Sequence, residues 1–357
     1  MKKINIFGLA FGFMGGFLGA GFVSGRELWQ FFGTFGGSGI IGAAIAAALL
    51  GTFAYMTERL ARHLGTDEPR EITVAFKNEA SKKIFSFLEI LFVFCIYVIM
   101  IAGAGSLFEQ IFGIPPIISS IIFAAVVSAV VALGVKWLVR VFSVTVPLLV
   151  LFSLIISVLT FAKGGAQSIS LEAAPVTNPL MSNPFISAFV FVSYNFFAAV
   201  SIIASLGKRT EKVKYIKGGI LLGTVFLFII SASIILSMLM TPNAAEKEIP
   251  MLVVAQKLGN VFYYGFAVLM GVGMFGSSTV SEFAICSYFK SRRGDTKKVT
   301  LLTVFIASVL AVAGSTLGFS TLINTVYPAF GYLGMFALVM LAVNFIRLKK
   351  QKKPKPN

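Results

Sequence analysis

The chain alternates between long apolar segments and short segments that carry most of its charged residues. A helix crosses the roughly 30 Å hydrocarbon core of a bilayer with about 20 apolar residues, and ten segments meet this length. The pattern therefore predicts an all-α integral membrane protein of about ten transmembrane helices. The predicted spans cover residues 4–33, 37–60, 84–112, 116–134, 138–162, 184–206, 215–241, 259–289, 299–319 and 325–346.

Composition supports a membrane protein and excludes several other classes. Of the 357 residues, 57% are hydrophobic and only 12% are charged, against roughly 25% charged residues in an ordinary soluble domain. The two cysteines, Cys95 and Cys286, lie in apolar segments and exclude a disulfide-rich scaffold. The sequence has no ATP-binding loop, HExxH or GxSxG motif, so it does not predict an enzyme or an organic cofactor.

The net charge of +16 is explained by membrane topology. Of the 30 Lys and Arg residues, 26 fall in the termini and alternate loops that ten spans would place on one side. Basic residues are retained on the cytoplasmic side, so we expect a multi-pass protein of the cytoplasmic (inner) membrane with both termini inside. The expected partner of this charge is the anionic lipid of the inner leaflet, and no nucleic acid is needed.

Ten spans divide into two halves of five, residues 1–163 and 164–346, followed by a basic tail over 347–357. Because each half has an odd number of spans, a structural repeat would be inverted. The loop lengths agree, since each half has its long polar loop after its second span. These loops predict short amphipathic helices over 70–82 and 246–259.

The first span of each half is predicted to be interrupted. Span one carries seven glycines between positions 8 and 25, and glycine costs about 1 kcal/mol per helix-interior position relative to alanine. Span six carries the polar residues Ser193, Tyr194 and Asn195 near its middle. Interrupted helices in corresponding positions of inverted halves are typical of a transporter's central binding site. Close helix packing through Gly-x-x-x-Gly pairs is the alternative explanation for the glycines.

The segment Gly19–Phe32, GAGFVSGRELWQFF, resembles the first span of the YkvI-like family of uncharacterised bacterial membrane proteins. The usual pattern of that family is close to GAGFASGQE, and this chain has Arg26 where Gln is common. The family is similar to the amino acid, polyamine and organocation transporter superfamily, which has the LeuT fold of five plus five inverted spans. The resemblance implies a carrier of amino acids or related small solutes coupled to sodium or protons.

In similar folds the substrate lies between the unwound parts of spans one and six. Helix amino termini there attract a carboxylate, and free backbone carbonyls receive an ammonium group or a cation. The resemblance therefore implies a set of substrate-binding positions on spans one, three and six. They are Gly19, Ala20, Gly21, Phe22, Tyr97, Tyr194, Asn195 and Phe196.

Span eight carries hydroxyl residues that resemble the common sodium site of this fold. We expect Ser277 and Ser278 to bind sodium opposite the carbonyls of Gly15 and Leu18 on span one. Thr279 is the register alternative, which applies if the hydroxyl pair is shifted by one residue along the helix. Sodium prefers such oxygen ligands. Hydroxyl groups in membrane helices also bond back to their own helix, which is the competing interpretation. The predicted function is thus sodium symport of a zwitterionic solute, an amino acid, by alternating access.

Charged residues in the spans predict gates or a proton site. Arg26 and Glu27 are expected to close the outer vestibule, with Glu109 as a further partner. Glu282 is expected either to form a cytoplasmic gate with Lys2 or Lys3, or to carry the proton of a proton-coupled amino acid or amine transporter. A membrane sensor that binds a solute without transporting it is the alternative from a different class.

Overall fold

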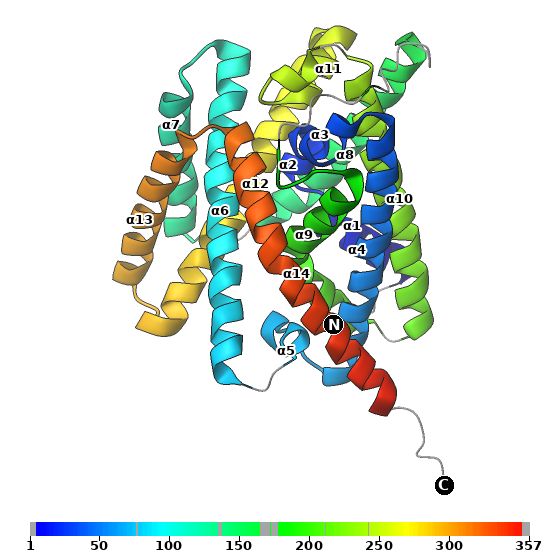
Figure 1. Cartoon of the computed structure of the whole chain (residues 1–357). Coiled ribbons are helices and arrows are strands. Elements are labelled where there is room, and N and C mark those ends of the chain that lie inside the picture. Colours follow the sequence, from blue (N-terminus) through cyan, green and yellow to red (C-terminus); the bar gives the residue numbers. More distant parts are fainter. Residues whose placement is uncertain are drawn as a thin grey trace.

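The computed structural model describes residues 5–75, 78–134, 138–164, 172, 178–210, 212–241 and 243–351, and all regular structure in these ranges is helical (Figure 1). Two short 3-10 helices cover Gly33–Phe35 and Ala244–Glu246. The α-helices are α1 (Ile6–Gly15), α2 (Ala20–Val23), α3 (Arg26–Phe31), α4 (Gly37–Leu64), α5 (Pro69–Thr73), α6 (Glu79–Phe112), α7 (Pro116–Ala132), α8 (Leu138–Gly164), α9 (Pro184–Arg209), α10 (Val213–Leu239), α11 (Pro250–Leu258), α12 (Asn260–Arg293), α13 (Lys297–Ser315) and α14 (Phe319–Gln351).

Eight of the described helices are long and apolar enough to cross a membrane. They are α4, α6, α8, α9, α10, α12, α13 and α14, and the shorter apolar helices α1 and α7 fall within two further predicted spans. The prediction of a helical multi-pass membrane protein is confirmed. The exact count of ten spans stays a prediction. Helix α9 is the most enclosed, with 72% of its most apolar window buried, so it forms the centre of the bundle against α4 and α14.

The first predicted span comprises three short helices. Helix α1 ends at Gly15 and α2 starts at Ala20, and the intervening amide of Gly19 bonds to the carbonyl of Phe17. Among the described residues, no N–H group donates to the carbonyl oxygen of Gly15 or Leu18. The chain thus leaves two carbonyl groups at the glycine-rich break without a donor from the described residues, that of Leu18 in a buried residue and that of Gly15 in an exposed one.

A second bend follows at Gly25, which separates α2 from α3. Its φ of +83° lies in the left-handed region, where glycine has no steric penalty. A Cβ atom at this position would stand 2.7 Å from Sδ of Met238 and 2.9 Å from Cγ of Met251. Glycine is therefore required by conformation and by packing, and the bend sets the directions of the two residues that follow.

The predicted interruption of span six is wrong for this structure, because α9 is one continuous helix from Pro184 to Arg209. Two of the three polar residues that predicted the break bond within the helix. Ser193 Oγ donates to the carbonyl of Phe189 at 2.7 Å, and Asn195 Nδ2 donates to the carbonyl of Phe191 at 3.0 Å. Side chains that bond one turn back need no unwound backbone, so polarity alone did not mark a break.

The two long loops carry the short helices α5 and α11, which lie at opposite ends of the bundle (Figure 1). The helix predicted over 70–82 is wrong in extent: α5 ends at Thr73, and residues 76–77 lie outside the described ranges. Helix α6 already begins at Glu79, because Asn78 Oδ1 caps it by accepting from the amide of Ala80 at 2.9 Å. Helix α11 is joined to the first span by the amide of Met251, which donates to the carbonyl of Ser24 at 3.0 Å.

Candidate functional site

A cavity of about 130 Å³ lies where the break between α1 and α2 faces α6, α9, α12 and α14. Six of the eight residues predicted to bind substrate line it, namely Gly19, Ala20, Gly21, Phe22, Tyr194 and Asn195. Aromatic and apolar side chains complete most of the lining, including Phe92, Met100 and Tyr327. The glycine-rich break therefore contributes the backbone of its glycines, together with Phe17 and Phe22, to the wall of a central cavity.

The other two predicted substrate residues do not line this cavity. The hydroxyl of Tyr97 instead donates to Glu282, 3.3 Å away, on the side of α6 that faces α12 and α13. Phe196 is 2% exposed and packs in the core. Tyr97 was assigned by its span alone, and its position along α6 turns it away from the break.

Glu27 is a charged residue in the lining of this cavity, although the sequence predicted an outer gate for it. It is 5% exposed, and the hydroxyl of Tyr194 donates a hydrogen bond to its Oε1 atom. The Tyr194 ring stacks on that of Tyr327, with centroids 4.5 Å apart and planes at 11°. A Cβ at Gly21 would stand 3.3 Å from Glu27 Oε2, so glycine lets the carboxyl group approach the backbone of α2.

Arg26 points away from the cavity, toward the loop before α11. Its Nε donates to Ser320 Oγ, and its Nη1 donates to the carbonyl of Ala245 at 2.8 Å. The amide and the hydroxyl of Ser320 both donate to Glu248 Oε2, each at 2.7 Å. Arg26 thus joins α3, the loop before α11 and the start of α14 in one polar cluster. Sequence reasoning missed Glu248, because it looked for an acid on the spans themselves.

Glu109, the predicted gate partner of Arg26 and Glu27, does not line the central cavity. With Glu248 it lines a separate cavity of about 300 Å³, formed by α6, α7 and the segment between α13 and α14. The hydroxyl residues Ser106, Ser315 and Thr316 contribute further polar groups. The two carboxyl groups therefore give this cavity an acidic lining, and Glu248 also belongs to the cluster of Arg26.

The residues predicted to bind sodium differ in their positions and in the hydrogen bonds of their hydroxyl groups. Gly15 and Ser277 line the central cavity. Ser278 is fully buried, and its Oγ has no hydrogen-bond partner among the described residues. Thr279 Oγ1, in contrast, donates to the carbonyl of its own helix at Phe275, 2.7 Å away. A buried hydroxyl without a partner fits a cation ligand, so the chemistry favours Ser278 over the register alternative Thr279.

Glu282 lies in a second polar cluster inside the bundle and is 0% exposed. Its Oε1 accepts hydrogen bonds from Tyr97, Ser128 and Ser308 at 3.3, 3.2 and 3.0 Å. Its Oε2 has no partner in the described part of the chain. The predicted gate partners Lys2 and Lys3 lie outside the described residues. The hydroxyl groups come from α6, α7 and α13, so this cluster joins four helices.

Comparison with known proteins identifies homologues along nearly the whole chain, although no family model matches the sequence. The uncharacterised membrane protein YkvI of Bacillus subtilis is 25% identical over 327 residues, which cover 92% of each protein. The uncharacterised protein YyaD of the same organism is 23% identical over 333 residues, 92% of this chain and 93% of YyaD. The homology that the GAGFVSGRE motif predicted is confirmed.

Solved structures of similar fold are membrane transporters. Inward-facing Mhp1 has a TM-score of 0.69 at 16% identity, over 99% of this chain and 79% of Mhp1. A Na⁺-coupled sialic acid symporter has a TM-score of 0.62 at 14% identity, over 94% of this chain and 78% of its own. MhsT in complex with L-phenylalanine has a TM-score of 0.59 at 15% identity, over 95% of this chain and 97% of MhsT. The chain is therefore a homologue of YkvI and YyaD, and its fold is the LeuT fold of secondary transporters.

Proposed function

We propose that the protein is a secondary active transporter that carries a small zwitterionic solute, an amino acid, by sodium symport with alternating access. One observation carries the proposal. The buried carboxyl group of Glu27 faces a cavity that is walled by the broken first span and by α9. In this fold the corresponding region is where transporters bind their cargo, and the three similar structures support that class of function.

Glu27 gives the cavity its selectivity for a positively charged group. A buried carboxylate is strongly destabilised unless a cation or hydrogen-bond donors accompany it. Tyr194 supplies one donor, and the described residues that line the cavity include no Lys, Arg or His. An ammonium group of the substrate would provide the missing charge, and the faces of Phe92, Tyr194 and Tyr327 would stabilise it further.

Backbone groups at the break accommodate the rest of an amino acid. The first amide groups of a helix have no acceptor within the helix, and Ala20 and Gly21 place theirs at the cavity wall, whereas the amide of Gly19 already donates to the carbonyl of Phe17. These donors would bind the substrate carboxylate. The cavity volume of about 130 Å³ and its aromatic lining favour a small substrate with an apolar part.

Sodium is proposed to bind between the broken first span and α12. The ligands are the hydroxyl groups of Ser277 and Ser278 and the carbonyl groups of Gly15 and Leu18. Two observations support this set: the hydroxyl of Ser278 is buried without a partner, and both carbonyls lack a donor in the described chain. Neutral oxygen ligands suit a monovalent cation that must be released in each transport cycle.

Uptake by proteoliposomes tests this function. Purified protein is reconstituted, a sodium or a potassium gradient is imposed, and the uptake of a panel of radiolabelled amino acids is measured. We expect one or a few amino acids to accumulate only with inward sodium, and the Glu27→Gln variant to lose this uptake. Accumulation that is independent of sodium would reject the coupling, whereas absence of uptake for every amino acid and amine would reject the transporter.

Proton coupling through Glu282 is the second candidate. It is favoured by the Oε2 atom of this fully buried side chain, which has no partner among the described residues, because a buried carboxylate whose hydrogen-bond donors are neutral hydroxyl groups needs a proton or a cation. In that case an inward proton gradient alone would drive uptake, and Glu282→Gln would abolish the dependence on the gradient. Ser278→Ala would then leave uptake unchanged.

We also propose that residues 1–163 and 164–346 are inverted repeats, with both termini on the cytoplasmic side of the inner membrane. The opposite positions of α5 and α11, each after the second span of its half, support this organisation (Figure 1). The basic tail 347–357 would then lie against the inner leaflet. Labelling of single engineered cysteines near α5 and α11 from either side of the membrane measures the topology.

A further inference from the structure

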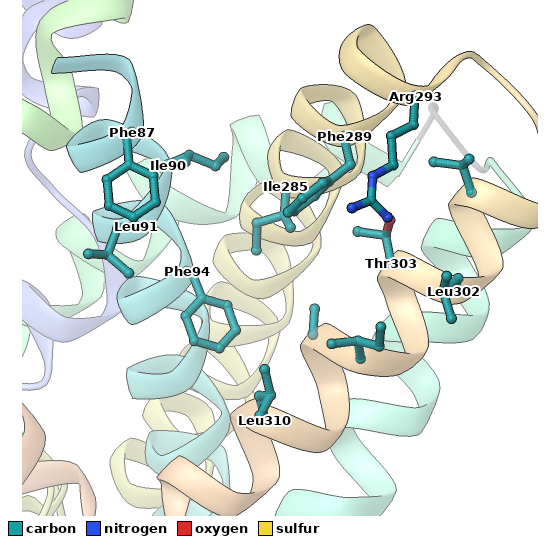
Figure 2. A pocket seen from close by; sticks show the side chains of 13 residues that line it. Phe87, Ile90, Leu91, Phe94, Ile285, Phe289, Arg293, Leu302, Thr303 and Leu310 are labelled. Atoms are coloured by element: carbon teal, nitrogen blue, oxygen red, sulfur yellow. The ribbon is translucent and has the colours of Figure 1, made fainter. Parts of the chain in front are cut away.

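An apolar groove of about 280 Å³ runs along the outside of the bundle between α6, α12 and α13 (Figure 2). Eleven of its thirteen lining side chains are apolar, and they include Phe87 and Phe94 on α6, Phe289 on α12 and Ile306 on α13. Phe87 and Ile306 are 55% and 47% exposed. All three helices are candidate membrane spans, so the groove faces the hydrocarbon region of the bilayer.

The length of the groove matches one leaflet. Its lining on α13 runs from Val299 to Leu310, and the eleven steps between these two residues rise about 16 Å along a helix. This is about half of the roughly 30 Å hydrocarbon core. An extended acyl chain that starts at one end of the groove would therefore reach the middle of the bilayer at the other end.

The end of the groove at Val299 carries a guanidinium group. Figure 2 shows the Arg293 side chain extending from α12 toward Thr303, across the groove end. Two neighbouring basic residues are engaged elsewhere, since Lys290 pairs with Asp295 at 2.9 Å and Arg292 lies 4.5 Å above the ring of Tyr288. Within the described ranges Arg293 has neither an anionic partner nor a hydrogen bond.

We propose that this groove binds an anionic phospholipid of the cytoplasmic leaflet, with an acyl chain against the apolar residues and the phosphate on Arg293. Guanidinium groups bind phosphate oxygens in a bidentate manner, and basic residues at this depth attract anionic headgroups. The segment 290–298 holds five basic residues and one acidic residue, so its charge is complementary to such a lipid. The site is separate from the central cavity and does not depend on the transport proposal.

Native mass spectrometry of the full-length protein in detergent tests the site, with phosphatidylglycerol and phosphatidylcholine of identical chains as probes. Wild-type protein is expected to bind phosphatidylglycerol more tightly, and Arg293→Ala to weaken that binding about fivefold without changing phosphatidylcholine binding. The matched control Arg292→Ala removes a neighbouring arginine outside the groove and is expected to bind as wild type.

A second pair of variants tests the acyl chain. Ile306→Trp fills the groove and should weaken the binding of both lipids, whereas Phe305→Trp, on the exposed face next to it, should not. Equal binding of both lipids by wild type, or equal effects of Arg293→Ala and Arg292→Ala, would overturn the proposal. Equal affinity for soluble glycerol phosphate would overturn it as well, because the phosphate would then bind without the acyl chain.

Discussion

The hydroxyl group of Tyr194 on α9 donates a hydrogen bond to the carboxyl group of Glu27 on α3, two residues that are 167 positions apart in the sequence. The bond links the broken first span to the central helix of the bundle, across the wall of the central cavity. In the proposed mechanism it orients the carboxylate for the ammonium group of the substrate.

Removal of this hydroxyl group should weaken substrate binding without unfolding the protein. Tyr194→Phe keeps the ring that stacks on Tyr327, and it removes a hydrogen bond to a charged group. Such bonds contribute about 1.5–3 kcal/mol, so we expect the KM for uptake to rise about tenfold or more. Tyr332→Phe is the control, since its hydroxyl donates to Leu180 on the protein exterior. Equal KM values for both variants would contradict the role of Tyr194.

The helical membrane class was predictable from the sequence because it follows from long apolar segments, and the LeuT fold was implied by the resemblance of the segment Gly19–Phe32. The directions of single side chains were not. Arg26 and Glu27 are adjacent and were assigned to one gate, yet successive residues of a helix point about 100° apart, and after the bend at Gly25 they reach different sites. The predicted break in span six failed for a related reason, since Ser193 and Asn195 bond within their own helix.

Sodium dependence should distinguish two adjacent hydroxyl residues. Ser278 Oγ has no partner in the described chain, whereas Thr279 Oγ1 donates to the carbonyl of Phe275. Ser278→Ala is therefore expected to raise the half-saturating sodium concentration for uptake about tenfold, because the loss of one ligand of a charged group weakens its binding by about this factor. Thr279→Ala should change it less than about twofold. The reverse order would show that the register alternative is correct and that Ser278 is a structural residue.

The bend at Gly25 should be intolerant of any side chain. Gly25→Ala forces an alanine into a left-handed conformation, which costs about 1–2 kcal/mol, and places its Cβ against Met238 and Met251. Gly65→Ala is the matched control, because Gly65 has a φ of +69° with no atom within 4 Å of the added Cβ. Thermal unfolding in detergent should show a larger decrease in Tm for Gly25→Ala. Equal decreases would mean that the packing around Gly25 can relax.

The cluster of Arg26, Ser320 and Glu248 should control access to the central cavity from the α11 side. Glu248→Gln weakens the acceptor of both Ser320 hydrogen bonds. We therefore expect the cluster to break more often and to open the central cavity on this side. The readout is the labelling rate of an engineered cysteine at Ala20 by a membrane-impermeant thiol reagent, with Cys95 and Cys286 replaced. We expect the rate to increase several-fold. A rate that stays unchanged, with normal folding, would remove this cluster from the gate.

The most direct test of the central claim is the stabilisation of purified protein by solutes, compared between wild type and Glu27→Gln. A ligand that binds only the folded state raises the apparent Tm by mass action. With sodium present, we predict that at least one amino acid raises the Tm of wild type and that Glu27→Gln abolishes this shift. The same amino acid without its amino group should have no effect. An undiminished shift in Glu27→Gln would contradict the assignment of Glu27 as the residue that binds the substrate's positive charge.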